Sequence, residues 1–173
     1  FELSMTVTAR VNIRGEIAVS GEHTMRAFVN NKKLLVRNPN SIRPWQHVLE
    51  PLFGYIILCQ QLISKPDIYS GAWNFGPNEE DAKSVSVLAD IMSNCWGANA
   101  QWEEDKGEHP HEANYLKLDC TKAKNILKWK PIWSLDHALV ETVNWYKAFY
   151  NNEDMNKFSK NQIEKYTMHE PVL

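Results

Sequence analysis

The hydrophobic period changes repeatedly along this chain, and this limits its fold more than any other feature. Residues 5–12 alternate between apolar and polar side chains, which is the period of a half-buried strand. Residues 50–63 instead repeat their apolar side chains about every 3.6 positions, as a helix with one buried face does. Short strands that alternate with helices predict an α/β architecture.

Capping residues and turn formers set the limits of the other expected elements. Asp81 or Ser84 can cap a helix that runs to Trp96, Asp119 one that runs to about Leu127, and Ser134 a last long helix. Further short helices are expected at residues 24–29 and 159–168, and further strands at 34–36, 71–77, 100–102 and 115–118. The segments 14–22 and 103–111 are expected to be loops.

Composition excludes several classes of protein. The 173 residues carry 19 Lys and Arg against 21 Asp and Glu, and this balance disfavours a nucleic-acid binder. The longest nearly apolar run, residues 52–59, is far shorter than the roughly 20 residues that a membrane span needs. The three cysteines form no Cys-x-x-Cys pair, so we expect buried, unreactive thiols and a cytoplasmic protein. Because the chain begins at Phe1, we also expect it to be a piece of a longer protein.

The densest cluster of chemically capable side chains lies in residues 37–48. Arg43 stands on a stiff segment next to a proline, and a guanidinium there suits a phosphate or a carboxylate. An ordinary surface loop with solvated arginines is the alternative. A second polar patch spans residues 109–112, but two histidines two positions apart and one glutamate fall short of the three or four ligands of a zinc site. We therefore expect no metal.

The run Asn-Pro-Asn-Ser-Ile-Arg-Pro-Trp-Gln-His-Val-Leu-Glu-Pro-Leu, at residues 38–52, resembles the substrate-domain motif of the CDP-glucose 4,6-dehydratases. These enzymes belong to the extended short-chain dehydrogenase/reductase family, which contains the NAD-dependent nucleotide-sugar epimerases and dehydratases. Three more blocks match in order, at residues 71–77, 109–123 and 127–131. The resemblance covers about residues 26–166 and implies the substrate-binding C-terminal part of a Rossmann-type nucleotide-sugar dehydratase, with the NAD-binding half missing.

The resemblance implies roles for particular residues. Arg43 would contact the pyrophosphate of a CDP-sugar, and Asn40, Gln46 and His47 would complete the substrate-binding set around it. His47 can instead be a structural residue whose ring is satisfied by internal hydrogen bonds. His111 and Glu112 would lie in a loop that closes over the sugar nucleotide, although an ordinary solvated acidic loop remains the alternative.

The chain lacks the catalytic parts that the family requires. None of its seven glycines forms a Gly-x-Gly-x-x-Gly or Gly-x-x-Gly-x-x-Gly loop, and no tyrosine has a lysine four residues later. We therefore expect no catalytic or cofactor-binding residue here, and NAD only in the full-length enzyme, which would make deoxysugar precursors and form a homodimer. The alternatives are a non-catalytic nucleotide-binding or dimerisation remnant and a nucleotide-sugar 4-epimerase-like relative.

The family pattern also predicts a division of the chain. Residues 1–30 would be a degenerate remnant of the junction with the Rossmann half, 31–158 the sugar-nucleotide-binding domain and 159–173 a C-terminal tail.

Overall fold

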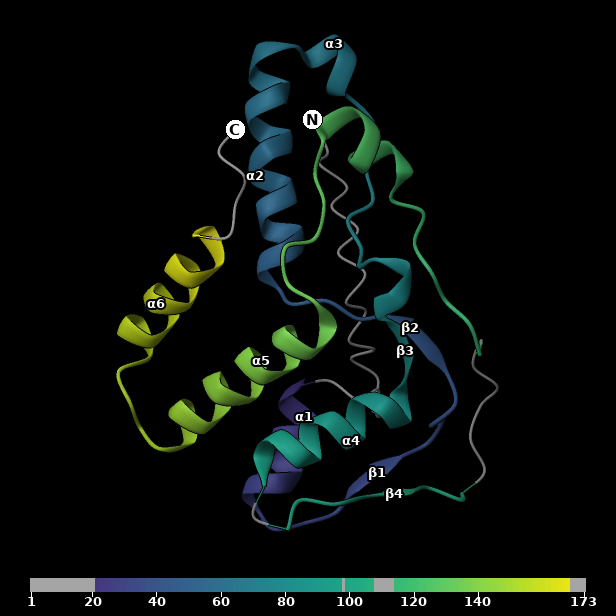
Figure 1. The fold of residues 1–173 in the computed structure, drawn as a ribbon, viewed down its shortest axis with the longest axis vertical. Helices are drawn as coiled ribbons and strands as arrows, with labels where there is room; N and C mark the ends of the chain where they lie inside the picture. The colour runs from purple at the N-terminus through teal and green to yellow at the C-terminus, as the bar shows by residue number, and fades with distance from the viewer. Residues whose placement is uncertain (1–20, 98, 108–113, 169–173) are drawn as a thin grey trace.

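The computed structural model describes residues 21–97, 99–107 and 114–168. Helices dominate, and the strands within the described part are three residues long (Figure 1). In chain order the elements are α1 (Gly21–Val29), β1 (Leu34–Val36), β2 (Ile42–Pro44), α2 (Leu49–Ser64), α3 (Pro66–Tyr69), η1 (Glu79–Asp81), β3 (Ala82–Ser84), α4 (Val85–Trp96), β4 (Trp102–Glu104), η2 (Ala123–Leu127), α5 (Leu135–Tyr150) and α6 (Met155–Thr167). The fold is therefore mixed α/β, as the alternating periods predict.

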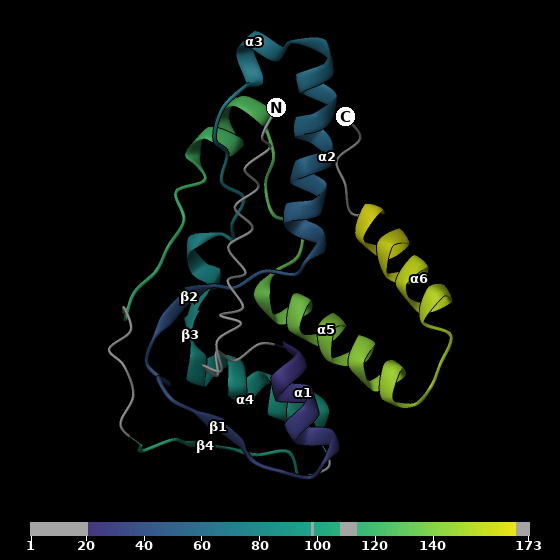
Figure 2. The ribbon, with the colours of Figure 1, turned by 180° about the vertical axis from the view of Figure 1, so that it is seen from behind.

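The four strands form two small sheets. β1 pairs in parallel with β4, and β2 pairs antiparallel with β3. Figures 1 and 2 show both sheets on the same side of the molecule as α1 and α4, whereas α2 extends away from them towards α3.

Two apolar clusters hold these elements together. The first joins α1, β1, α4 and α5, and its buried members are Met25, Phe28, Leu34, Val36, Val85, Leu88, Ala89, Met92, Leu135, Leu139 and Val143. The second packs one face of α2 against the chain around η2, and its buried members are Ile57, Leu58, Phe75, Cys120, Ala123, Leu127 and Trp129. Burial of these side chains supplies the main driving force for folding.

Two of the predicted helix caps, Ser84 and Ser134, are confirmed. The Ser84 hydroxyl accepts a hydrogen bond from the Val87 N–H, and the Ser134 hydroxyl accepts one from the His137 N–H. The predicted helix at 159–168 begins earlier, at Met155, because the Asp154 carboxylate accepts hydrogen bonds from the N–H groups of Asn156 and Lys157. The predicted helix at 119–127 ends in a π-helical turn, and Lys128 in the left-handed region closes it.

The strand predicted at 71–77 is wrong. The segment pairs with no described strand, and side chains reach two of its carbonyls: Lys122 Nζ donates to the Ala72 carbonyl and Gln46 Nε2 to the Phe75 carbonyl. The strand predicted at 115–118 is reduced to a single bridge between Tyr115 and Ile42.

The strand predicted at 100–102 lies instead at Trp102–Glu104, so two of its three residues fall in the segment expected to be a loop. The strand expected at 5–12 lies outside the described residues.

The cysteine prediction is confirmed in part. All three thiols are free, but only Cys120 is buried, while Cys95 is half-buried and Cys59 is exposed on α2. Within the described ranges, no helix is both long and apolar enough to cross a bilayer.

Candidate functional site

Strand β2 places Arg43 between two other segments of the chain. On one side it pairs with β3, where Arg43 stands opposite Lys83. On the other side the Ile42 N–H donates to the Asn114 carbonyl at 2.9 Å, and the Leu116 N–H donates to the Ile42 carbonyl at 3.1 Å. Arg43 therefore lies on the central strand of a small three-segment arrangement, and its backbone position is fixed from both edges.

The pairing of Arg43 with Lys83 gathers two cations. Directly opposed residues of an antiparallel pair point to the same face, with Cβ atoms about 4.5–5.5 Å apart. Arg43 is half-buried, and its Nη1 donates to the Ile42 carbonyl at 3.0 Å. A bound anion would interact favourably with both cations. The arrangement suits a diphosphate, since arginine binds it in a fork and lysine as a point charge.

Lys83 is a candidate site residue that the sequence did not reveal. It precedes the helix cap Ser84 and belongs to no recognisable motif, so only its register opposite Arg43 brings it to the site.

Asn40 lies at the exposed end of the turn before β2. The Ser41 N–H closes that turn on the Asn38 carbonyl, and the Ser86 N–H of α4 donates to the Pro39 carbonyl. The start of α4 therefore holds the turn, and the amide of Asn40 remains accessible three residues before Arg43.

Trp45 and Gln46 fix the chain that leaves β2. The Trp45 indole N–H donates to the Lys83 carbonyl at 3.0 Å, and Gln46 Nε2 donates to the Phe75 carbonyl at 2.8 Å. Gln46 Oε1 is buried and has no hydrogen-bond partner among the described residues. The side chain of Gln46 thus supports the loop that carries Arg43.

His47 is buried in the interior, with 6% of its surface exposed. Its Nδ1 accepts a hydrogen bond from the Leu49 N–H at the start of α2, and its ring packs edge-on against Trp133 with the centroids 4.8 Å apart. Burial lowers the pKa of His47 to about 4, so the ring is neutral at physiological pH; Glu141 opposes this shift and His137 adds to it. This placement favours the structural alternative for His47.

Glu50 forms a second buried polar centre that the sequence analysis did not single out. Its carboxylate is 1% exposed and accepts hydrogen bonds from the N–H groups of Ile132 and Trp133 and from the Tyr166 hydroxyl. Burial raises the pKa of Glu50, while these hydrogen bonds oppose the rise. The carboxylate joins α2, the segment before α5 and the end of α6.

His111 and Glu112 lie outside the described residues. The described chain resumes at Asn114, whose carbonyl oxygen accepts the hydrogen bond from Ile42 next to Arg43. The roles of His111 and Glu112 therefore stay predictions.

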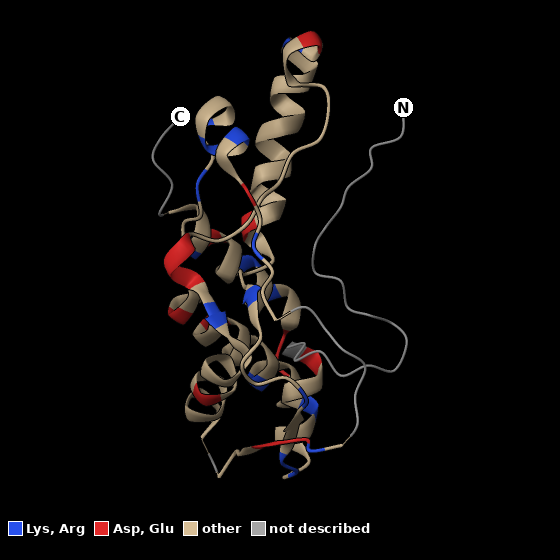
Figure 3. Cartoon of the chain, turned by 90° about the vertical axis from the view of Figure 1, so that its right-hand side faces the viewer, with Lys and Arg blue, Asp and Glu red and all other residues tan. Residues whose placement is uncertain are grey.

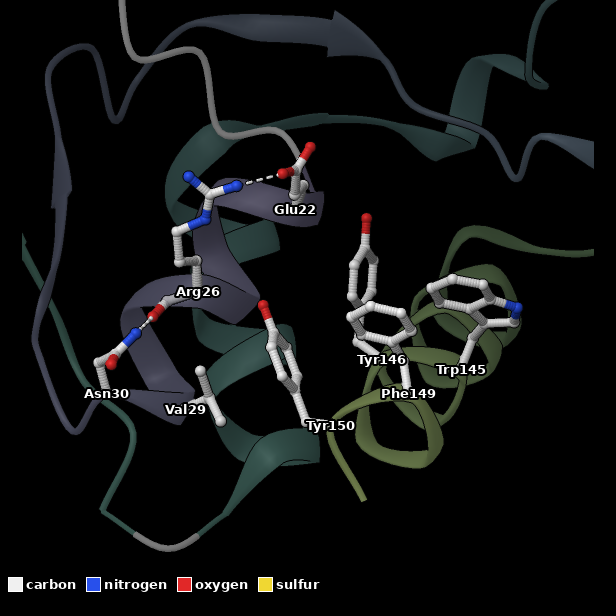
Figure 4. A pocket seen from close by; sticks show the side chains of 8 residues that line it. All are labelled: Glu22, Arg26, Val29, Asn30, Trp145, Tyr146, Phe149 and Tyr150. Atoms are coloured by element: carbon white, nitrogen blue, oxygen red, sulfur yellow. Dashed lines mark hydrogen bonds and ion pairs between the residues drawn. The ribbon is translucent and has the colours of Figure 1, made fainter. Parts of the chain in front are cut away.

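A separate open cavity lies between α1 and α5 (Figure 4). Four aromatic side chains of α5 form one wall, where the rings of Trp145 and Phe149 stack 5.6 Å apart. Arg26 and Glu22 of α1 form an ion pair on the other side. None of the substrate-binding residues predicted from the sequence lines this cavity.

The described residues do not fit the pyrophosphate of NAD. A dinucleotide site needs a glycine-rich turn that leads from a strand into a helix. β1 leads into the Asn38–Ser41 turn and then β2, whereas β2 leads into α2 and β3 into α4 without a glycine between strand and helix. No group of three or more His, Cys, Asp or Glu side chains within the described ranges could hold a metal ion.

No protein-family model matches the chain. A curated relative does: the CDP-glucose 4,6-dehydratase of Salmonella typhimurium is 51% identical over 142 residues. The match covers 82% of this chain but only 40% of that relative, so the chain spans well under half of its length. The resemblance that the motif blocks predict is therefore confirmed.

Solved structures share the fold. The UDP-glucuronic acid 4-epimerase from Bacillus cereus, in complex with UDP-glucuronic acid and NAD, matches with a TM-score of 0.63 and 20% identity. The match covers 75% of this chain and 40% of the epimerase chain. A variant of the same epimerase, in complex with UDP-4-deoxy-4-fluoro-glucuronic acid and NAD, gives a TM-score of 0.64 at 19% identity, over 79% of this chain and 42% of that chain. At this identity the likeness concerns the fold alone.

Proposed function

We propose that this chain is the sugar-nucleotide-binding part of a CDP-glucose 4,6-dehydratase-like lyase. In this proposal Arg43 and Lys83 hold the pyrophosphate of a CDP-sugar, and Asn40 contacts the same ligand from the neighbouring turn. The opposed cations on β2 and β3 are the observation that carries the proposal, and the 51% identity to a CDP-glucose 4,6-dehydratase supports CDP as the nucleotide.

The test is calorimetric titration of the chain with CDP. Arg43→Ala removes a charge-assisted contact worth about 1.5–3 kcal/mol, so the dissociation constant should rise by about 10- to 150-fold. Arg43→Lys keeps the charge but loses the fork and should recover part of the affinity. Arg26→Ala, which removes an exposed cation paired with Glu22 on α1, is the matched control and should leave the affinity unchanged. Equal affinity for CDP in the wild type and Arg43→Ala would exclude the pyrophosphate role.

Turnover belongs to the whole enzyme in this proposal. The expected reaction converts CDP-glucose to CDP-4-keto-6-deoxyglucose through transient oxidation at C4, and NAD supplies the hydride chemistry when it is bound. The described residues do not fit NAD, so the cofactor is assigned to the part of the enzyme outside this chain. Incubation of the chain alone with CDP-glucose and NAD should give no 4-keto-6-deoxy product, and its formation would contradict this division of roles.

An epimerase-like relative that uses a UDP-sugar is the second candidate. Its support is the fold shared with the UDP-glucuronic acid 4-epimerase, which at 20% identity does not extend to the substrate. Competition between CDP and UDP for the same site separates the two candidates: tighter binding of UDP would favour the epimerase-like alternative. A remnant that only dimerises would bind neither nucleotide.

The assembly and location of the enzyme complete the proposal. A homodimer is expected for the full-length enzyme, and the three free thiols support a reducing compartment such as the cytoplasm.

A further inference from the structure

The last helix, α6, is anchored by two buried polar side chains. Near its middle, Gln162 Nε2 donates to the carbonyl and carboxylate oxygens of Glu141 on α5, at 2.9 and 3.1 Å. In its last turn, the Tyr166 hydroxyl donates to Glu50 Oε2 of α2 at 2.8 Å. Gln162 is 6% exposed and Tyr166 is 2% exposed. Figures 1 and 2 show this arrangement: α6 folds back beside α5, and its C-terminal end lies next to α2.

The two anchors join α6 to different parts of the molecule. Gln162 connects α6 to the helix that directly precedes it in the chain. Tyr166 instead reaches the first turn of α2, 116 positions away in the sequence. The same carboxylate of Glu50 also accepts hydrogen bonds from the N–H groups of Ile132 and Trp133. Tyr166 therefore completes a contact among α2, α6 and the segment before α5.

Glu50 is unusual in its own helix. It is the one charged side chain of α2, and Figure 3 shows the helix beyond its first turn without acidic or basic residues. With 1% of its surface exposed, the carboxylate has lost its contact with water and depends on protein donors. Loss of one donor would leave a carboxylate oxygen short of a partner, and the start of α2 would have to shift to recover one.

A row of rings links Tyr166 to the same part of the chain by a second route. The ring of Tyr166 packs edge-on against Trp133 with the centroids 5.1 Å apart, and Trp133 packs edge-on against His47 at 4.8 Å. Three residues separate His47 from Arg43 of the candidate anion site. Both the carboxylate of Glu50 and the row of rings therefore connect Tyr166 to the segment that follows Arg43.

This connection matters for a guanidinium that binds a diphosphate. A fork of two parallel hydrogen bonds requires one orientation of the group. Binding groups have to be held to within about 0.5 Å by residues that support them from behind. The segment at residues 44–50 provides that support for Arg43, and Tyr166 contacts it from α6.

We propose that Tyr166 is a positioning residue for the anion site. By holding Glu50 and Trp133, it keeps residues 44–50 in the conformation in which Arg43 binds a diphosphate. The inference rests on the proposed function, because that function assigns the pyrophosphate to Arg43. It gives α6 a part in nucleotide binding that needs no contact between α6 and the ligand.

The test compares the two anchors of α6. Tyr166→Phe removes the hydroxyl that Glu50 accepts and keeps the ring, whereas the control Gln162→Met removes the hydrogen bonds to Glu141 and keeps the length of the side chain. Calorimetric titration with CDP is made well below the melting temperature of each variant. The dissociation constant should rise by about 2- to 30-fold in Tyr166→Phe, the range for residues that act through a packed network, and should stay unchanged in Gln162→Met.

A double-mutant cycle with Arg43 separates positioning from a general loss of structure. If Tyr166 acts through Arg43, Tyr166→Phe should change the dissociation constant by less than about 2-fold once Arg43→Ala is present. A merely structural role would weaken binding by the same factor with and without Arg43.

Three results would overturn the inference: an unchanged dissociation constant in Tyr166→Phe, an equal rise in Gln162→Met, or the same fold-change in both Arg43 backgrounds. Hydrogen exchange of the ligand-free chain keeps the two proposals distinct. Tyr166→Phe should raise the exchange rates of the amides at residues 45–49, and Gln162→Met should not. If the wild type does not bind CDP but exchange rises in this way, the proposed function alone fails. If CDP binds and exchange does not rise, the role of Tyr166 alone fails.

Discussion

The buried imidazole of His47 makes the stability of the fold depend on pH in a calculable way. In the unfolded chain the pKa of His47 is about 6.5, and in the folded chain burial lowers it to about 4. The unfolded state therefore binds the proton first as the pH falls. Stability from this group is fully present above pH 6.5 and is lost progressively as the pH falls towards 4.

The magnitude follows from the two pKa values. Between pH 8 and pH 5 the unfolded chain gains almost a full proton at His47 and the folded chain gains little, so the free energy of unfolding should fall by about 2 kcal/mol. Glu50 acts in the opposite direction: burial raises its pKa, and stability from that group is lost as the pH rises through the folded pKa. The wild-type profile contains both contributions, so the difference between matched variants is the informative quantity.

The variant is His47→Asn, whose amide oxygen can replace Nδ1 as the acceptor for the Leu49 N–H. The control is His137→Asn. Both rings pack edge-on against Trp133 at a centroid distance of 4.8 Å, but only His47 is buried. Urea unfolding at a series of pH values from 4.5 to 8 measures the free energy of unfolding for each protein.

The contribution of His47 should disappear in His47→Asn. It should persist in His137→Asn, where burial, the main cause of the shift, remains and only the smaller contribution of His137 is lost. The ring contact with Trp133 is lost in each variant, so a change in packing alone shifts the whole curve without changing its slope. Parallel pH profiles for the wild type and His47→Asn would refute the reasoning. They would mean that His47 takes up its proton over the same pH range in the folded and the unfolded chain, so that burial does not lower its pKa.

Two further substitutions test how α2 is held. Glu50→Ala leaves the N–H groups of Ile132 and Trp133 and the Tyr166 hydroxyl without their acceptor. The free energy of unfolding, measured by urea titration, should therefore fall by about 3–6 kcal/mol. A urea midpoint equal to that of the wild type would show that these hydrogen bonds do not hold α2 in place. Gly54→Ala would place a Cβ 2.9 Å from Cγ of Phe75 and closer still to two other ring carbons. Thermal unfolding should therefore show a loss of about 1–3 kcal/mol in the free energy of unfolding, and adding Phe75→Leu should restore part of it. An unchanged melting temperature would show that the ring can move aside.

Local signals in the sequence predicted the helices well. Ser84 and Ser134 each begin a helix as expected, because a cap depends on residues only three positions away. The order of motif blocks also predicted the relationship to the dehydratases, which the 51% identity confirms.

Features that depend on tertiary contacts were not predictable in this way. The apolar alternation around Phe75 suggested a strand, but the ring is buried against Gly54, Tyr55 and Trp129, and the backbone is held by side chains. The short strands β2 and β3 carry polar residues and a proline, so no periodicity marks them. Their register brings Lys83 to Arg43 across a separation of forty residues in the sequence.

The structure gives different roles to neighbouring residues of one motif. After Arg43, the next three side chains that can hydrogen-bond all face protein groups: Trp45 donates to the Lys83 carbonyl, Gln46 to the Phe75 carbonyl, and His47 accepts from the Leu49 N–H. The first of these bonds joins the chain beyond β2 to β3, and the second joins it to the segment that contains Phe75. The third lies at the first residue of α2.

An arginine that is to meet a diphosphate must be held in one orientation, because the fork geometry tolerates little displacement. The hydrogen-bonded segment between β2 and α2 therefore holds Arg43 in position. The hydrogen bonds that Glu50 accepts from Trp133 and Tyr166 fix α2, the helix into which this segment leads.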